Sequence, residues 1–558
     1  MQTHMPPDLP ETYYLDNVLT LFAHVQRVYA DILDPEPLQF LERFDRLGAD
    51  ASKLCIRLLN RSHDRYRCSK LNYPEIKSLQ TAITELADSG FIELNSEIEQ
   101  SDLLALYTLA ELRALMSDYP ALSALGKLRR SELEDLLIES AGDGFFQRLQ
   151  QQDDLLQLRH RDEYLLCQML FFGNLSQSMT DFVLNDLGLN QFENYRIDPE
   201  HRPYRNNIEV RQHWLLYQLQ ALFELADSSD CTQLRELARM IPNDIEHQAP
   251  GFRKSERLRY ECARQLERQG DLKSANRHYR QCLLPPSRER RARIHNQRGK
   301  QHKALKLCEQ IIEQPLDEQE LQFACQFSLR LCKRHDLAPP ESATQMHLSH
   351  RPQIVDLELD YHASVELAVA EFYNATDNGG HCHYVENSLF NGVLGLLIWD
   401  VIFAPLPGAF YNPFQYRPSD FYAHDFCNRR AQLLQQTFAE IKSNEDIWRI
   451  IEPRWQLKQG LMNPLVNWQA LDLELIQLAL DRIDHAHWRA IFDRILQDLR
   501  NNRSGFPDLL YFPGTGGYCL VEVKGPGDSL QKNQQRWMQY FQEHGIAHRL
   551  DRVSWRSH

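Results

Sequence analysis

The chain has 558 residues, 43% of them hydrophobic, which suffices for several domains at about 100–200 residues each. No segment reaches the roughly 18–20 uninterrupted apolar residues that span a bilayer, and the acidic N-terminus lacks the basic start and apolar core of a secretion signal. We therefore expect a cytoplasmic protein with no membrane partner. The 12 cysteines form no CxxC pair, which argues against a structural zinc finger or a disulfide framework.

The net charge of −15 argues against a general nucleic-acid binder, but the charge is distributed unevenly. Between Gly251 and Gln310 there are 17 Lys and Arg against 6 Asp and Glu. A binding surface for phosphates needs positive charge on one face only, so this segment is a candidate for contacting nucleic acid. The alternative is a set of basic helix faces exposed to solvent, and charge alone does not choose between the two.

The first 100 residues are predicted to be a helical, DNA-binding region. Apolar residues recur at three- and four-residue spacing over Leu38–Leu59 and Leu79–Leu86, which indicates helices. Within Tyr73–Leu94 a helix is followed by a Ser-Gly stop and a short β-type tail, which is typical of a winged-helix-like unit. An ordinary helix that ends in a glycine cap would give the same pattern.

Residues 101–145 are predicted to form a separate helical hairpin. The segments TLAELRALM and SELEDLLIE are both helical in pattern, and Ser131 with Glu134 matches a capping box for the second helix. The pattern resembles the SAP module, a small DNA-binding unit. Its basic linker supplies three candidate DNA contacts: Lys127, Arg129 and Arg130.

Residues 146–345 are predicted to be helical and to contain a repeat. Gly270 and Gly299 are 29 residues apart, and so are Ala275 and Ala304. The pattern resembles a degenerate tetratricopeptide array, whose helices bind partners on a concave face. The arginine content of this array favours DNA as the partner.

Residues 346–558 are predicted to form an α/β domain. Helices are followed by β-type runs at Leu509–Phe512, Tyr518–Lys524 and Ala547–Val553. The glycine-rich loop Pro513–Gly517 allows the first two runs to pair as a hairpin. The fold class is therefore multidomain, with mainly α-helical N-terminal two-thirds and a C-terminal α/β domain.

The hairpin carries the candidate catalytic centre. The period of two along a strand places Glu522 and Lys524 on one face, and the hairpin brings Asp508 opposite them. Carboxylate oxygens are the ligands that Mg²⁺ or Mn²⁺ prefers, and the carbonyl of Val523 is a further candidate ligand. Such a cation activates water and offsets charge on a phosphate, while a lysine positions the water or stabilises the transition state. The alternative is a surface hairpin with a salt bridge.

Two further residues are candidates for this site. Glu386 shares a predicted helical face with Leu389 and Phe390 in the apolar segment Val385–Pro405. A carboxylate on so apolar a helix needs a partner, either a metal or a buried arginine. Gln534 lies in the predicted helix Leu530–Gln542 and is a candidate contact near the phosphate path.

The motifs ENSLF with GLLIWDVIF, GFPDLLYF and LVEVKGPGDSL resemble the VRR-NUC branch of the PD-(D/E)XK nucleases. More closely, the chain is similar to the Fanconi-anaemia-associated nuclease family from about Leu38 to the C-terminus. The resemblance implies a metal-dependent endonuclease with 5′-to-3′ exonuclease activity, which cuts near 5′ flaps in branched DNA and acts in interstrand crosslink repair. It also implies a VRR-NUC nuclease domain at residues 346–558.

By motif position, the resemblance makes Asp508, Glu522 and Glu386 metal ligands and Lys524 the catalytic lysine. Arg500 and Arg503 fall where family members carry basic residues, so they are candidate phosphate contacts. Eukaryotic relatives carry an N-terminal ubiquitin-binding zinc finger, which this sequence lacks. We therefore expect a bacterial protein that is cytoplasmic and associates with the nucleoid when it acts.

Two other functions remain open. One is a PD-(D/E)XK nuclease that acts on four-way junctions or foreign DNA. The other is a non-catalytic DNA-binding scaffold, which a missing acidic residue or lysine in the motif would have favoured; none is missing.

Overall fold

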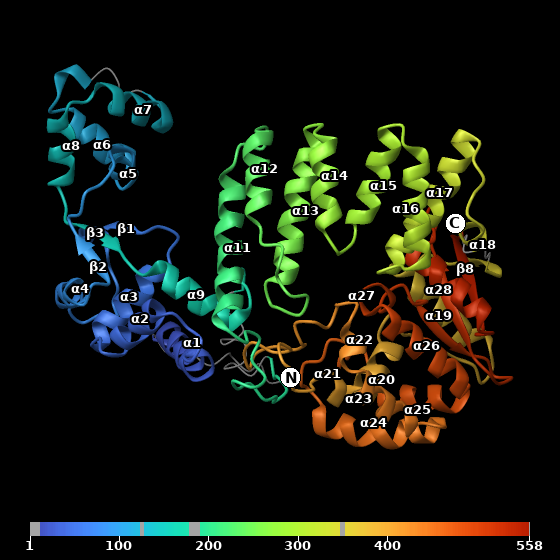
Figure 1. Cartoon of the computed structure of the whole chain (residues 1–558). Helices are drawn as coiled ribbons and strands as arrows, with labels where there is room; N and C mark the ends of the chain where they lie inside the picture. The colour runs from blue at the N-terminus through green and yellow to red at the C-terminus, as the bar shows by residue number, and fades with distance from the viewer. Residues whose placement is uncertain (1–11, 123–127, 178–189, 346–351, 557–558) are drawn as a thin grey trace. The chain divides into compact units, whose positions relative to one another are not determined.

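The computed structural model describes residues 12–122, 128–177, 190–345 and 352–556 (Figure 1). The chain divides into two compact units, Met1–Leu187 and Gly188–His558. Among the described residues, every helix is too short or too polar to cross a membrane.

The N-terminal unit combines helices with a small antiparallel sheet. In chain order, and apart from an insertion, its elements are α1 (Tyr13–Tyr29), α2 (Pro35–Asp45), α3 (Ala49–Leu59), β1 (Arg65–Arg67), the 3-10 turn η1 (Cys68–Lys70), α4 (Leu79–Asp88), β2 (Ile92–Leu94), β3 (Leu155–Leu158) and α9 (Arg161–Phe172). The strand order is β1-β3-β2. The helix-then-strand pattern predicted for Tyr73–Leu94 is confirmed, and Gly90, with φ of 74°, makes the turn between α4 and β2.

A helical module is inserted between β2 and β3 of this sheet. Its helices are α5 (Gln100–Ala105), α6 (Leu109–Met116), α7 (Arg130–Ser140) and α8 (Asp143–Gln150), and they enclose their own hydrophobic core around Leu104, Leu112 and Leu133. The prediction of Ser131 as the helix cap is wrong. α7 begins at Arg130, and the Glu132 carboxylate accepts a hydrogen bond of 3.4 Å from the backbone N–H of the N-cap residue Arg129.

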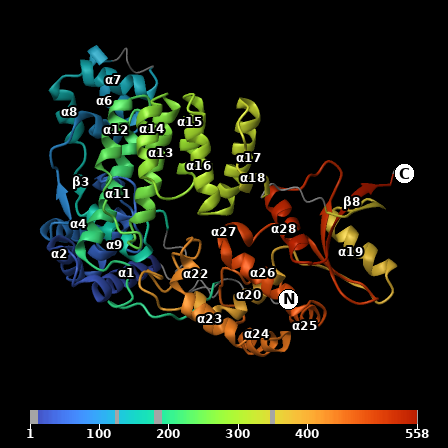
Figure 2. The same ribbon diagram turned by 45° about the vertical axis from the view of Figure 1, so that its right-hand side comes forward.

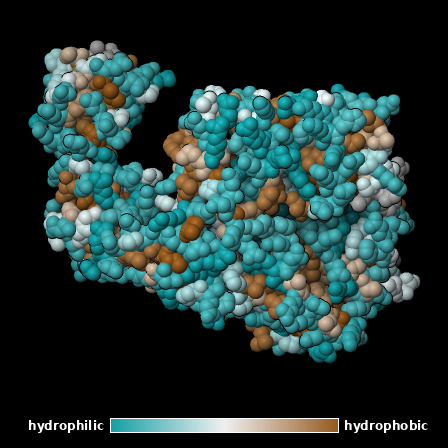
Figure 3. Space-filling model, in the orientation of Figure 1, coloured by the Kyte–Doolittle hydropathy of each residue, from teal (hydrophilic) through white to brown (hydrophobic). Residues whose placement is uncertain are grey.

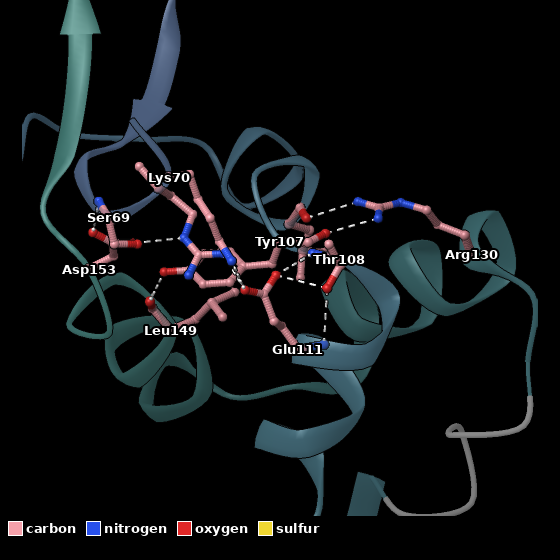
Figure 4. A network of polar contacts seen from close by, with 10 residues as sticks. Ser69, Lys70, Tyr107, Thr108, Glu111, Arg130, Leu149 and Asp153 are labelled. Carbon is pink, nitrogen blue, oxygen red and sulfur yellow. Dashed lines mark hydrogen bonds and ion pairs between the residues drawn. The ribbon is translucent and has the colours of Figure 1, made fainter. Parts of the chain in front are cut away.

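A polar network joins this module to β1 (Figure 4). The Arg67 guanidinium lies 4.0 Å from the centre of the Tyr107 ring and is ion-paired with Asp153 at 3.0 Å and with Glu111 at 2.8 Å. Hydrogen bonds from Thr108, and then the Arg67 guanidinium, hold the pKa of Glu111 well below its usual range. Because Arg67 is nearly buried, the inserted module and the sheet depend on one another for charge compensation.

The first part of the second unit is a stack of antiparallel helices (Figures 1 and 2). They are α11 (Asn207–Leu225), α12 (Cys231–Met240), α13 (Phe252–Arg268), α14 (Leu272–Gln281), α15 (Ser287–Gln297), α16 (Gln301–Glu313), α17 (Glu318–His335) and the short α18 (Glu341–Gln345). The internal repeat is visible in the structure. Gly270 and Gly299, with φ of 83° and 69°, follow α13 and α15, and Ala275 and Ala304 are fully buried in α14 and α16.

The C-terminal domain is a mixed five-stranded sheet with an extensive helical insertion. Its elements are β4 (Ile354–Leu359), α19 (Val365–Thr376), β5 (His381–Tyr384), α20 (Leu389–Leu397), α21 (Trp399–Ile402), α22 (Phe426–Arg429), α23 (Ala431–Ala439), α24 (Asn444–Lys458), α25 (Leu473–Arg482), α26 (His485–Gln497), α27 (Leu499–Asn502), β6 (Leu509–Phe512), β7 (Cys519–Lys524), α28 (Lys532–Glu543) and β8 (His548–Trp555). The strand order is β4-β8-β7-β6-β5, with β7 parallel to β8 and antiparallel to β6.

The two faces of the sheet are covered by different helices. Val521 and Val523 pack with Tyr373 of α19 on one face. Glu522 contacts Gln534 of α28, so it lies on the other face. This alternation confirms the predicted arrangement of the β7 side chains. The predicted fold class is confirmed as well, although the strands β4 and β5 were not predicted.

We predict that Arg67→Met destabilises the contact between the inserted module and β1 by about 3 kcal/mol, because the nearly buried Asp153 carboxylate loses its ion-pair partner and keeps only hydrogen bonds from Ser69. Backbone hydrogen exchange in α6 should become faster in this variant than in the wild type, and the increase in α6 should exceed any increase in α1. The control is Arg159→Met, which breaks the exposed pair with Glu93 and should cost less than about 1 kcal/mol. Equal exchange rates of α6 in Arg67→Met and Arg159→Met would contradict the prediction.

Candidate active site

The β6–β7 hairpin brings the predicted catalytic residues together. Leu509 pairs with Val521 in the ladder, and Asp508 immediately precedes β6. The Asp508 carboxylate accepts a hydrogen bond of 2.8 Å from the backbone N–H of Val523. Asp508 is therefore fixed next to Glu522 and Lys524 by the register of the hairpin.

Glu522 is the most deeply buried member of the group, with no exposed surface. Its Oε1 atom accepts hydrogen bonds from Lys524 Nζ and from Gln534 Nε2, each at 2.5 Å. Its Oε2 atom is also buried and has no hydrogen-bond partner. A buried carboxylate oxygen without a partner is costly unless something binds it, so this atom indicates a position for a ligand.

Burial and mutual repulsion favour protonated carboxyl groups here in the metal-free protein. Burial, reinforced by the nearby Asp508, raises the pKa of Glu522 to about 8. Burial also raises the pKa of Asp508 to about 6, and the charge of Glu386 adds to this effect. The ammonium of Lys524 opposes both shifts without cancelling them. The site is thus short of positive charge.

Glu386 reaches the site from a turn and not from a helix. The prediction of a continuous helix over Val385–Pro405 is wrong, because α20 begins only at Leu389. The backbone N–H of Val385 donates to the carbonyl of Asp508 at 2.9 Å, and Asn387 has a left-handed φ of 51°. These two features place the exposed Glu386 carboxylate beside the other two acids, where it accepts a hydrogen bond from Asn387 Nδ2 at 3.0 Å.

Two residues near the site were missed by the sequence analysis. Glu366, in the first turn of α19, adds negative charge that raises the pKa of Asp508. Tyr384, at the end of β5, donates its hydroxyl hydrogen to Glu386 while 48% of the residue stays exposed. Since β5 itself was not predicted, nothing in the sequence linked either residue to the hairpin.

Arg500 and Arg503 lie on an exposed surface in the same unit. Arg500 lines a cavity of about 160 Å³ together with Arg253 and Tyr422. Arg503 stacks on Tyr422, 4.9 Å from the ring centre. Among the described residues, neither arginine has an ion-pair partner, so both are available for an anion.

The three candidates from the basic linker differ in their contacts. Lys127 lies outside the described residues. Arg129 is exposed. Arg130 is engaged within the fold, because its guanidinium donates to the carbonyls of Tyr107 and Leu104 (Figure 4). It also pairs with Glu134 at 2.8 Å.

The donor set fits a divalent cation. Asp508, Glu522 and Glu386 supply hard oxygen atoms, and the partnerless Glu522 Oε2 is oriented by two donors on the opposite oxygen. A second group of metal-type side chains, formed by Asp198, Glu200 and His201, precedes α11. There the Asp198 carboxylate is already paired with His201 at 2.7 Å and with Arg196.

Comparison with known proteins gives consistent matches along the whole chain. Residues 442–555 match the VRR-NUC domain family, and residues 12–93 match the family described as "FAN1, HTH domain". The chain is 32% identical to the Fanconi-associated nuclease 1 homolog of Pseudomonas aeruginosa, over 98% of this chain and 97% of that protein. It is 26% identical to mouse Fanconi-associated nuclease 1, over 96% of this chain and 62% of that protein.

A solved structure is similar over almost the same extent. The crystal structure of paFAN1 bound to DNA with a 2-nucleotide 5′ flap and a gap matches with a TM-score of 0.82 and 31% identity, over 99% of this chain and 100% of that chain. These matches confirm the resemblance recognised in the sequence motifs.

We predict that the metal-free protein loses stability as the pH rises towards about 8, because the unfolded chain releases the Glu522 proton at lower pH than the folded protein does. The pKa of Glu522 is higher in the folded state than in the unfolded state, so this contribution is present in acid and is lost as the carboxyl ionises. Glu522→Gln should flatten this decline. Melting temperatures measured across this pH range without divalent cation test the prediction.

The same experiment with Mg²⁺ or Mn²⁺ provides a second comparison. The wild type should gain melting temperature on binding the cation, and Glu522→Gln should gain less, since it lacks one anionic ligand. Without divalent cation, parallel curves of melting temperature against pH for the wild type and Glu522→Gln would contradict the predicted effect of the raised Glu522 pKa.

Proposed function

Because the chain belongs to the Fanconi-associated nuclease family, we propose that it is a structure-selective DNA nuclease that hydrolyses phosphodiester bonds near 5′ flaps. The observation that carries this proposal is the buried Glu522 Oε2 atom, which lacks a partner beside Asp508, Lys524 and Glu386. A scaffold that only bound DNA would have no reason to bury two neighbouring carboxyl groups, one of them with an unpaired oxygen.

The catalytic roles follow from the positions of the side chains. Asp508, Glu522, Glu386 and the carbonyl of Val523 would hold the cation, which we propose is Mg²⁺ or Mn²⁺. When bound, the cation supplies Lewis-acid chemistry, lowering the pKa of water and offsetting the charge that grows on the scissile phosphate. Gln534 keeps Glu522 oriented through its 2.5 Å hydrogen bond, so its role in this proposal is positioning.

Lys524 is the residue best placed to act on the reacting atoms. Its Nζ atom donates to Glu522, and only 14% of its side chain is exposed. An ammonium has three hydrogen atoms to donate, so those not used by Glu522 are available for the attacking water or for a phosphoryl oxygen. We assign it to positioning that water and stabilising the transition state.

The substrate follows from the family and from the exposed arginines. The similar protein paFAN1 is bound to DNA with a 5′ flap in its crystal structure, and we propose the same class of branched DNA for this chain. Arg500, Arg503 and Arg129 would contact phosphates, which positions DNA without reading its sequence. The biological role we propose is interstrand crosslink repair in the bacterial cytoplasm, at the nucleoid, with 5′-to-3′ exonuclease activity following incision.

We predict that Asp508→Ala or Lys524→Ala reduces cleavage by about a thousandfold or more, while binding of flap DNA changes little. The measurement uses labelled flap, four-way-junction and linear DNA, with and without Mg²⁺. The wild type should cut the flap fastest and only with the cation. Preference for the junction would favour the alternative nuclease function, and no cleavage of any substrate would favour a scaffold.

We predict that Arg500→Gln/Arg503→Gln weakens flap binding and lowers its salt slope by about 2, at roughly 0.9 for each phosphate that is no longer neutralised. The matched control is Arg449→Gln/Arg489→Gln, because these exposed arginines are paired with Asp446 and Asp493. Binding is measured in an Asp508→Ala background to prevent cleavage. An equal slope in both double variants would move the DNA path away from α27.

A further inference from the structure

The two edges of the five-stranded sheet differ in their backbone hydrogen bonds. Strand β5 forms one edge, and its outward backbone groups are occupied by a side chain of α19. The N–H of Cys382 donates to Asn374 Oδ1 at 2.8 Å, and the Cys382 carbonyl accepts from Asn374 Nδ2 at 3.2 Å. The Asn374 amide thus takes the place of a neighbouring strand and closes this edge. Strand β4 forms the other edge, and it lacks such a cover.

The pairing of β4 with β8 uses the backbone of every second residue. In this parallel ladder the carbonyl of Gln353 accepts from the N–H of Leu550 at 2.8 Å, and the carbonyl of Leu359 accepts from the N–H of Arg556 at 2.9 Å. The N–H and C=O groups of one residue point to the same side of a strand, and the side alternates along the chain. The odd-numbered positions of β4 therefore face β8.

The alternate positions of β4, Ile354, Asp356 and Glu358, direct their backbone groups away from the sheet. Within the part of the chain that the structure describes, no group donates to their carbonyls or accepts from their N–H groups. All three residues are exposed. A strand edge with free and accessible donors and acceptors is a template on which another strand can pair.

The exposed side chains along this open edge are acidic. Asp356, Glu358 and Asp360 recur at every second position, which places them on one face of the extended chain. Asp356 lies 3.9 Å from Arg552 of β8, and Asp360 lies 3.3 Å from Arg556. In the described ranges Glu358 has no ion-pair partner. A second copy of β4 would bring acid against acid, whereas a strand with basic side chains would be attracted.

The opposite face of β4 is apolar and belongs to the core beneath α19. Leu357 and Leu359 pack in this core with Val369. Val355 and Leu357 are only partly buried, so an added strand would cover them further. On the face of the molecule shown in Figure 3, hydrophilic residues prevail and apolar residues form small patches. Backbone pairing and charge, rather than a broad apolar surface, are therefore what this edge offers a partner.

We propose that the open edge of β4 binds an extended basic segment of a partner protein as an additional strand of the sheet. Its backbone would pair with Asp356 and Glu358, its Lys or Arg side chains would lie beside their carboxylates, and its apolar side chains would cover Val355 and Leu357. Strand β8 separates β4 from β7, which carries Glu522, so the added strand would leave the proposed metal ligands uncovered. The inference goes beyond the nuclease activity and does not depend on it.

The first test measures the affinity of the full chain for labelled peptides by fluorescence anisotropy. A peptide of alternating Lys and Val should bind, and its counterpart of alternating Glu and Val should bind several-fold more weakly. Two further Lys–Val peptides carry N-methyl groups, one on the Lys and the other on the Val residues. Only one of these two sets of N–H groups can face β4, so one methylated peptide should lose about tenfold or more in affinity while the other keeps it.

The second test compares Asp356→Pro with Asp356→Asn. Both variants lack the carboxylate, but only proline removes the outward N–H, and an edge position tolerates proline because that N–H does not pair with β8. Asp356→Pro should bind the Lys–Val peptide about tenfold more weakly than Asp356→Asn. Glu358→Lys should narrow the difference between the Lys–Val and Glu–Val peptides. If Asp356→Pro does not fold, the methylated peptides decide the question on the wild type.

Hydrogen exchange of the β4 amides identifies what occupies the edge. In the free protein Asp356 and Glu358 should exchange fast, and the Lys–Val peptide should slow them. Slow exchange in a free monomer would show that another segment of this chain covers the edge, and a dimer that Asp356→Pro dissociates would assign it to a second copy. Either result overturns the proposal.

Three peptide results would overturn it as well. They are failure of the Lys–Val peptide to bind the wild type, equal affinities of the two methylated peptides, and equal affinities of Asp356→Pro and Asp356→Asn. The last two would mean that attraction between charges, without strand pairing, holds the peptide. Cleavage of flap DNA by the wild type is a separate measurement, and its outcome bears only on the proposed nuclease function.

Discussion

The structure of the catalytic domain depends on the burial of Glu522. A carboxylate with no exposed surface is held between an ammonium and an amide, with one oxygen left unpaired. The sheet, the hairpin register and α28 all contribute to this arrangement. Lys524 supplies one positive charge for three neighbouring acids, so without a cation the burial of Asp508 and Glu522 favours their protonated forms. The same lack of positive charge is what the proposed divalent cation would offset.

Long-range contacts carry this constraint into the rest of the second unit. The Val385–Asp508 hydrogen bond positions the turn that bears Glu386, and Asn387 Oδ1 accepts from the backbone of Phe506 at 3.2 Å. On the other side, Glu318 links the helical repeats to α26 and α28. Breaking any of these contacts would disturb the positions of the proposed metal ligands without altering the ligands chemically.

The net charge of the chain hides two opposite local fields. Acidic groups are concentrated around the proposed cation site, and among the described residues several basic groups on the repeats and near α27 have no ion-pair partner. DNA is complementary to the basic groups, since its phosphates are attracted to them, and the proposed cation would offset the charge of the carboxylates where the phosphates approach them. A negative net charge is therefore compatible with DNA as the substrate.

The sequence by itself determined the local parts of this protein. The period of two along β7 predicted that Glu522 and Lys524 share a face, and the repeated Gly and Ala predicted the helix pairs α13–α14 and α15–α16. Both patterns depend on neighbours in the chain. Only the tertiary structure decided which residues meet across long separations. Glu386 lies in a turn because of a hydrogen bond to Asp508, 123 residues from Val385, and Arg288 is neutralised by Glu320 of another helix. Periodicity reports which face a side chain occupies, but the partner on that face depends on how distant segments pack together.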